Sequence, residues 1–164
     1  MSWFAENVLP YFPEYKLFIT GSIVENDELL KTLKTHNTEW LGRVSRSELI
    51  KLRQESSAVV IPNILQPNQN DFEAYGYVTI ESVASGGLVV ASNYQGLADS
   101  LKKGQLGFLA EASDLKSWVS VLNDVINLEK KEKIQIITER TSYIKNNLTL
   151  DKVFKETEKL YESL

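Results

Sequence analysis

The chain has 164 residues, of which 43% are hydrophobic and 24% are charged, as expected for one globular domain with its own core. The formal net charge of −4 provides no basic surface for nucleic acid, and the lack of cysteine excludes a disulfide framework or a thiolate metal site. No apolar run reaches the roughly 18 residues of a membrane span, and residues 1–7 lack the features of a secretory leader, so we expect a cytoplasmic chain.

Apolar periodicity and turn residues predict that helices and strands alternate along most of the chain. In chain order we expect a helix at 3–13, a strand at 15–20, a helix at 27–34, a strand at 38–42, a helix at 45–54, a strand at 57–62, a helix at 77–85, a strand at 88–92, a helix at 96–103, a strand at 107–110, and helices at 114–127, 129–146 and 150–163. The polar segment 63–71 is expected to be irregular, because it is rich in Pro, Asn and Asp.

This alternation predicts a Rossmann-like α/β domain of three layers, with one parallel sheet, right-handed crossovers and helices on both faces. Residues 1–164 are expected to form a single domain. The strand at 57–62 is nearly all apolar, as expected when helices cover both faces. The two C-terminal helices have no strand after them, so we expect them to pack across the sheet or against another domain.

Side chains at two helix starts predict caps. Ser45 and Glu48 have the spacing of a capping box, in which each side chain accepts from the backbone N–H of the other. Ser113 is expected to cap the helix 114–127. That helix should turn four apolar residues inward: Leu115, Val119, Leu122 and Ile126. Trp40 and Trp118 also fit core-facing positions.

The start of the helix at 77–85 is the candidate binding site. It follows the strand 57–62, and parallel α/β sheets bind ligands where strands end and helices begin. The first N–H groups of a helix lack internal partners and carry partial positive charge, which favours phosphates or sugar hydroxyls. Gly76 has no Cβ and allows a ligand to approach the backbone closely.

Two glutamates, Glu73 and Glu81, bracket this helix start. In the turn, Glu73 could accept hydrogen bonds from sugar hydroxyls or stabilise developing positive charge. One turn into the helix, Glu81 could accept from a ribose diol, because a carboxylate offers two acceptor oxygens. The spacing alone leaves a second interpretation open, in which both acids are solvated and simply compensate the helix dipole.

Six segments, in order, resemble the C-terminal nucleotide-sugar-binding domain of glycosyltransferase family 4, a retaining family with the GT-B fold. The Glu-x7-Glu signature of that family matches Glu73 to Glu81. The six matching segments are Lys16–Gly21, Trp40–Leu49, Ala58–Pro62, Glu73–Gly86, Val89–Leu97 and Gly104–Leu109.

The resemblance implies a role for each matching residue. Glu81 would bind the ribose, and Glu73 would lie beside the donor sugar at the reacting face, as the catalytic position. The backbone of Val44, after Gly42, would hold the base. Backbone groups at the helix start would bind the donor: Ala74, Tyr75, Gly76 and Tyr77 its sugar hydroxyls, Val78 and Thr79 its phosphates.

The implied activity is transfer of a hexosyl group, with retention of configuration, from a UDP- or GDP-linked sugar to a glycan or lipid-linked acceptor. No metal and no cofactor are expected. The Arg and Lys with which the family clamps the diphosphate lie on a segment before the first helix and are not in this chain. An N-terminal acceptor-binding domain of roughly 150–200 residues would be a partner outside this chain. We expect an isolated donor half without activity, from an enzyme acting in the cytoplasm or at the inner face of the membrane.

The sequence has three rival interpretations. A nucleotide-sugar epimerase or phosphorylase of GT-B fold would share the architecture but not the acid spacing within these flanks. A non-enzymatic module could bind a nucleotide on the same helix start. A glycosidase that uses both acids is disfavoured, because hydrolases hold their two acids across one cleft and Glu81 lies inside a helix.

Overall fold

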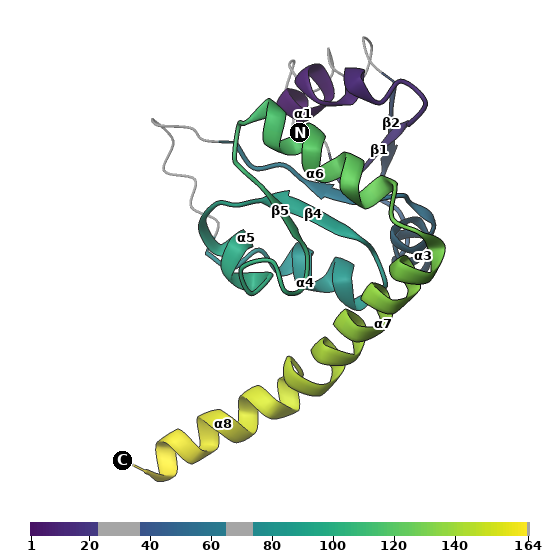
Figure 1. Cartoon of the computed structure of the whole chain (residues 1–164). Helices are drawn as coiled ribbons and strands as arrows, with labels where there is room; N and C mark the ends of the chain where they lie inside the picture. Colours follow the sequence, from purple (N-terminus) through teal and green to yellow (C-terminus); the bar gives the residue numbers. More distant parts are fainter. Residues whose placement is uncertain (23–36, 65–73, 164) are drawn as a thin grey trace.

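The computed structural model describes residues 1–22, 37–64 and 74–163. The predicted helix at 27–34 and most of the segment 63–71 lie outside these residues. Within them, strands and helices alternate as predicted (Figure 1). The elements are α1 (Ser2–Asn7), a short 3-10 helix η1 (Leu9–Tyr11), β1 (Leu17–Thr20), β2 (Thr38–Gly42), α3 (Arg46–Glu55), β3 (Val59–Ile61), α4 (Tyr77–Ala84), β4 (Val89–Ser92), α5 (Gln95–Ser100), β5 (Phe108–Ala110), α6 (Leu115–Ile126), α7 (Lys130–Asn147) and α8 (Leu150–Glu162).

All described strand pairs are parallel, and helices cover both sides, so the predicted α/β class is confirmed. The strands form two groups rather than one continuous sheet. One group pairs β1 with β2, and the other has the order β3-β4-β5. Among the described residues, no ladder of hydrogen bonds joins β1 to β3.

The core has two parts, one on each side of β4. Val90 packs with residues of α1, β1 and α6, where Trp118 is fully buried and its ring meets Phe4 edge-on at 5.4 Å between centroids. Val89 and Ala91 face the opposite side and pack with α4, α5 and α7. Because side chains alternate along a strand, β4 is buried on both faces and anchors the domain.

Two predicted core assignments fail. The observed strand β3 (Val59–Ile61), within the predicted range 57–62, is only half-buried, whereas full cover was expected. Its open side faces β1 across two cavities that residues of both strands line. Trp40 is 44% exposed, because β2 has no helix among the described residues that covers its side chain.

The capping box of α3 is confirmed. The N–H of Ser45 donates to Glu48 Oε2 at 2.8 Å, and the N–H of Glu48 donates to Ser45 Oγ at 3.3 Å. The predicted cap of α6 is wrong by one residue. Asp114 accepts from the second and third helical amides at 2.9 and 3.1 Å, while Ser113 has a left-handed φ of 60° that takes its side chain out of the cap position.

The two C-terminal helices differ in their packing. The α7 helix lies against α4, and Ile144 is buried there. Figure 1 shows α8 continuing away from the sheets, and its apolar residues are exposed: Leu150, Val153, Phe154, Leu160 and Tyr161. Across the described ranges, none of the helices combines the length and apolarity that a membrane crossing requires.

Candidate functional site

The α4 helix begins at the predicted position, Tyr77, after a left-handed glycine. Gly76 is the N-cap residue, with φ 67° and ψ 53°, a conformation that a residue with a Cβ adopts only at a cost. Tyr77 and Val78 are the first two helical residues, and their N–H groups have no acceptor within the helix. The N–H groups of Tyr77 and Val78 and the positive end of the helix dipole therefore point outward from the sheet.

A second glycine locks this turn in place. A Cβ at Gly96, in the first turn of α5, would lie 2.3 Å from the carbonyl oxygen of Ala74 and 2.5 Å from the amide nitrogen of Tyr75. A Cβ at Gly76 would lie 2.5 Å from a methyl carbon of Leu97. The backbones of the turn and of α5 therefore touch directly, which only glycine at these positions permits.

Buried hydroxyls hold the same turn from beneath. Thr79 is fully buried, and its Oγ1 lies 2.7 Å from the Gly76 carbonyl oxygen and 2.7 Å from Ser100 Oγ. Ser100 also donates to the Leu97 carbonyl at 2.9 Å. The N–H of Thr79 donates to Gly76 at 2.9 Å, so this amide is already occupied. The turn is fixed by packing and by hydrogen bonds before any ligand arrives.

An aromatic pair flanks the helix start, which sequence reasoning did not single out. The rings of Tyr75 and Tyr77 lie 5.0 Å apart between centroids, at an interplanar angle of 58°. They are 37% and 72% exposed. The alternation Tyr-Gly-Tyr was the available signal, because two aromatic residues around a turn glycine are brought to one side. Exposed aromatic faces of this kind can stack on a sugar or a base.

Glu81 lies on α4 as predicted, and its carboxylate faces α3. Its Oε2 is 3.8 Å from Nη2 of Arg53, whose side chain is 10% exposed whereas that of Glu81 is 66% exposed. Arg53 also donates to Ser85 Oγ at 3.3 Å. Burial lowers the pKa of Arg53, and the charge of Glu81 opposes that shift. The long contact leaves carboxylate lone pairs of Glu81 available to a ligand.

Glu73, the predicted catalytic residue, lies outside the described residues. Ala74, its neighbour, is exposed and begins the described part of the turn. The position of Glu73 beside the helix start therefore stays a prediction.

The predicted base-binding residues lie where β1 and β2 end. Gly42 has a φ of 69°, and its carbonyl accepts from the N–H of Gly21 at 2.9 Å. The indole of Trp40 donates to the Gly21 carbonyl at 2.9 Å, and Arg43 Nε donates to Ser22 Oγ at 2.8 Å. These bonds tie the two strand ends together just before Val44, which is half-buried.

A cavity of about 360 Å³ connects the strand ends with α4. Its walls include Thr20 at the end of β1, Leu49 on α3, and Pro62 after β3. Of the described residues predicted to bind the donor, only Val78 is in its wall, and Arg53 also lines it. This arrangement can accept a ligand that places an anionic group at the helix start and an apolar group on the side of α3. Among the described residues, no three His, Cys, Asp or Glu side chains gather as a metal site requires.

Comparison with known proteins identifies the family of this chain. A model of the family described as glycosyl transferases group 1 matches residues 4–142. A glycogen synthase of Mycobacterium tuberculosis is 26% identical over 119 residues, which is 70% of this chain and 27% of that protein. The capsular polysaccharide biosynthesis glycosyltransferase CapM of Staphylococcus aureus is 25% identical over 152 residues, 86% of this chain and 40% of that protein.

Solved structures share the fold. A glycosyltransferase from Rickettsia africae superposes with a TM-score of 0.78 at 16% identity, covering 99% of this chain and 45% of that one. Anabaena Alr3699/HepE, solved in complex with UDP-glucose, gives a TM-score of 0.71 at 17% identity, covering 99% and 43%. The fold is that of GT-B glycosyltransferases, and the chain spans less than half the length of each of these relatives.

Proposed function

This chain belongs to the glycosyl transferases group 1 family, and we propose that it is the donor-binding half of a retaining hexosyltransferase. The observation that carries the proposal is the start of α4, where two amides point outward from a turn fixed by Gly96 and Thr79. Such a helix start is suited to the diphosphate of a nucleotide sugar. The UDP-glucose bound to the Anabaena protein of the same fold is consistent with that ligand class.

Each predicted residue has a place in this proposal. The N–H of Val78 approaches the diphosphate, while that of Thr79 is used within the turn and holds its shape. Backbone groups of Ala74, Tyr75, Gly76 and Tyr77 meet the sugar hydroxyls. Gly42 and Val44 hold the base. Glu81 accepts from the ribose diol, and Glu73 stands at the reacting face of the sugar.

In the proposed reaction the bond between the anomeric carbon and the diphosphate breaks. The acceptor hydroxyl oxygen bonds to that carbon on the same face, and its proton passes to the departing diphosphate. Negative charge develops on the departing diphosphate. The preformed amides at the start of α4 stabilise that charge without reorganising, which is how fixed dipoles lower a barrier. We propose that no metal is needed, because protein groups neutralise the phosphates.

The acceptor, a glycan or a lipid-linked sugar, is proposed to bind to the rest of a longer enzyme. This follows from the share of each relative that the chain spans, between 27% and 45%. Residues 1–164 are accordingly proposed to bind the donor and to lack transferase activity by themselves.

Calorimetric titration with UDP-glucose, GDP-mannose and ADP-glucose at millimolar concentrations tests the proposal. We expect one of these to bind, and we expect Glu81→Gln to weaken that binding at least tenfold. Glu158→Gln is the matched control, because Glu158 is exposed on α8, far along the chain from the helix start. Equal affinity in the two variants would contradict the role given to Glu81. A ligand that binds equally well without its phosphates would contradict the role of the helix start.

A further inference from the structure

Arg53 is a nearly buried cation next to the candidate site. It lies in the last turn of α3, its side chain is 10% exposed, and it lines the cavity of about 360 Å³ together with Val78. Removing a charged group from water costs free energy unless another charge or a hydrogen-bond acceptor compensates it. The groups that compensate Arg53 therefore indicate what its burial achieves.

Both side chains that Arg53 contacts through hydrogen bonds or ion pairing belong to α4. Its Nη2 lies 3.8 Å from Oε2 of Glu81, and its Nη1 donates to Oγ of Ser85 at 3.3 Å. That hydroxyl in turn donates to the carbonyl of Glu81 at 2.7 Å. Glu81 and Ser85 lie one above the other on one face of the helix, because they are four residues apart. The guanidinium is therefore attached to the turn of α4 that carries Glu81.

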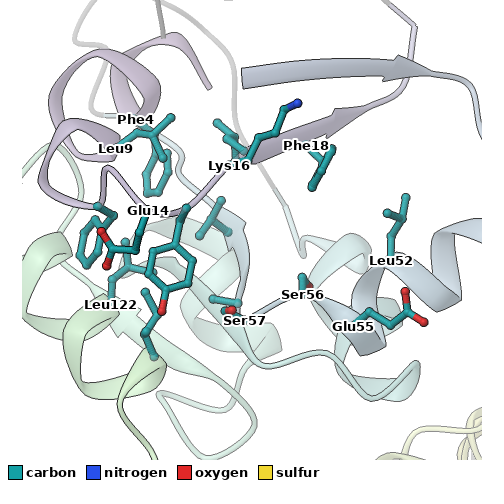
Figure 2. Close-up of a pocket in the computed structure, with 16 residues that line it drawn as sticks. Phe4, Leu9, Glu14, Lys16, Phe18, Leu52, Glu55, Ser56, Ser57 and Leu122 are labelled. Atoms are coloured by element: carbon teal, nitrogen blue, oxygen red, sulfur yellow. The ribbon is translucent and has the colours of Figure 1, made fainter. Parts of the chain in front are cut away.

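The nearest acid in the sequence, Glu55, does not compensate Arg53. Its Oε1 lies 3.9 Å from Nζ of Lys51, and it lines a second cavity, of about 480 Å³, together with Leu52 (Figure 2). Among the described residues, Glu81 is the only carboxylate that pairs with Arg53. The pair thus joins α3 to α4, although a partner on its own helix was available to Arg53 in the sequence.

The backbone of Arg53 is held against the turn that follows α4. A Cβ at Gly87 would lie 2.8 Å from a methyl carbon of Val59 and 3.4 Å from the carbonyl oxygen of Arg53. That carbonyl also accepts from the hydroxyl of Ser56 at 3.3 Å. The end of α3 is therefore packed closely on its neighbours, which fixes where the guanidinium can lie relative to α4.

The carboxylate of Glu81 has one oxygen that is held and one that is available. Oε2 faces Arg53, whereas Oε1 has no hydrogen bond or ion pair with any described residue. Ser85, to which Arg53 also donates, lies on the C-terminal side of Glu81, whereas long helical side chains lean toward the N-terminal end of their helix. Seen from the start of α4, the guanidinium is thus attached behind Glu81.

The inference that follows rests on the proposed function, in which Glu81 accepts from the ribose diol. We propose that Arg53 is a positioning residue, which holds Oε2 of Glu81 so that Oε1 is presented to the ribose hydroxyls. An exposed glutamate without such a partner moves among several rotamers, and a ligand must then stop that motion at a cost in entropy. Arg53 orders the carboxylate before the nucleotide arrives, and it thereby makes the donor site selective for ribose hydroxyls.

Selectivity for the ribose is measured with nucleotides that differ only in those hydroxyls. The probes are UDP, GDP and their 2′,3′-dideoxy analogues, titrated at millimolar concentrations, and the readout is the ratio of the two Kd values for each base. Both members of a pair carry the same phosphates, so the ratio isolates the ribose contacts. For the base that binds, we expect the dideoxy analogue to bind at least tenfold more weakly to the unsubstituted chain.

Arg53→Met should reduce this ratio to below threefold, because UDP or GDP loses affinity while the dideoxy analogue still binds. Binding of the analogue also reports that the variant is folded. Lys51→Met is the matched control, because Lys51 is a cation of the same helix whose carboxylate partner is Glu55, and its side chain is 72% exposed. That variant should keep a ratio of at least tenfold.

Two further measurements separate positioning from direct contact. In a chain that already carries Glu81→Gln, adding Arg53→Met should leave the ratio unchanged, because Arg53 acts through the carboxylate. Without any nucleotide, three-bond couplings should report one χ1 rotamer of Glu81 in the unsubstituted chain and in Lys51→Met, and averaged rotamers in Arg53→Met.

The possible failures are distinguishable. A ratio near one in the unsubstituted chain, or no binding of any of these nucleotides, would contradict the proposed role of Glu81 and overturn this inference with it. A ratio of at least tenfold that Arg53→Met leaves unchanged would overturn this inference alone. A further fall of the ratio when Arg53→Met is added to Glu81→Gln, or equally averaged Glu81 rotamers with and without Arg53, would likewise overturn it and leave the role of Glu81 intact.

Discussion

The β3-β4-β5 region and the β1-β2 region both consist of parallel strands, but they differ in how far their residues are buried. All four residues of β4 are buried, whereas Phe18 in β1 is 48% exposed and Trp40 in β2 is 44% exposed. The proposed phosphate-binding turn lies on the closed region, where Gly96 and Thr79 fix it. The proposed base-binding residues lie on the open region, held by single bonds between strand ends. The turn proposed to bind the phosphates, which must be preorganised, therefore lies in the region that is fully packed.

We expect the largest difference in stability between the two regions from substitution of their tryptophans. Trp118→Ala removes a fully buried ring and is expected to lower the free energy of unfolding by about 3–5 kcal/mol. Trp40→Ala loses mainly the hydrogen bond to Gly21, worth about 1 kcal/mol. Urea denaturation of both variants measures the difference. Equal losses would show that the β1-β2 region is packed as tightly as the core.

Substitution of two glycines should distinguish an effect on the turn at the start of α4 from a general loss of stability. Gly96→Ala forces a Cβ against the backbone of Ala74 and should cost about 1–3 kcal/mol, together with nucleotide-sugar binding. Gly107→Ala meets the side chain of Leu101 at 2.8 Å and should also cost stability, because that site is crowded too. It should leave binding intact once the variant is folded. Loss of binding in both variants would mean that stability, rather than the turn, is responsible.

Thr79→Val tests the hydroxyl network beneath the turn. The change keeps the shape but removes the hydroxyl that contacts both the Gly76 carbonyl and Ser100 Oγ, at an expected cost of about 1–2 kcal/mol. Thr157→Val on the exposed α8 helix is the control, with an expected change below about 0.5 kcal/mol. Thermal unfolding of the pair gives the comparison. A silent Thr79→Val would show that the turn does not depend on this network.

The capping box of α3 should give the smallest effect, in the open region. Ser45→Ala is expected to cost about 1 kcal/mol. Hydrogen bonds from Ser45 lower the pKa of Glu48 in the folded protein. A carboxyl with a depressed folded pKa stabilises the protein above its unfolded pKa of about 4.3, and this contribution disappears as pH falls through the folded value. Glu48→Gln should therefore destabilise at pH 7, and this cost should shrink as the pH falls through the folded pKa of Glu48. A cost independent of pH would contradict this origin.

Local signals in the sequence were sufficient for some of these features and not for others. The Ser45 and Glu48 box depends on residues three apart, and it formed as predicted. The turn glycine Gly76 was likewise predicted from its own neighbourhood. Contacts between distant segments left no local signal: Gly96 meets Ala74, and Arg53 approaches Glu81, only because separate elements pack together. Trp40 was misassigned because its apolar strand lies in the half of the domain that is left open.

The most direct test of the central claim is amide chemical shift mapping with UDP-glucose, with GDP-mannose as the second ligand. The account predicts that the amide signals of Tyr77 and Val78 shift most and saturate with ligand, that Gly42 and Val44 follow, and that Glu81→Gln reduces every one of these shifts. Saturating shifts confined to other parts of the chain, with Tyr77 and Val78 unmoved, would contradict it.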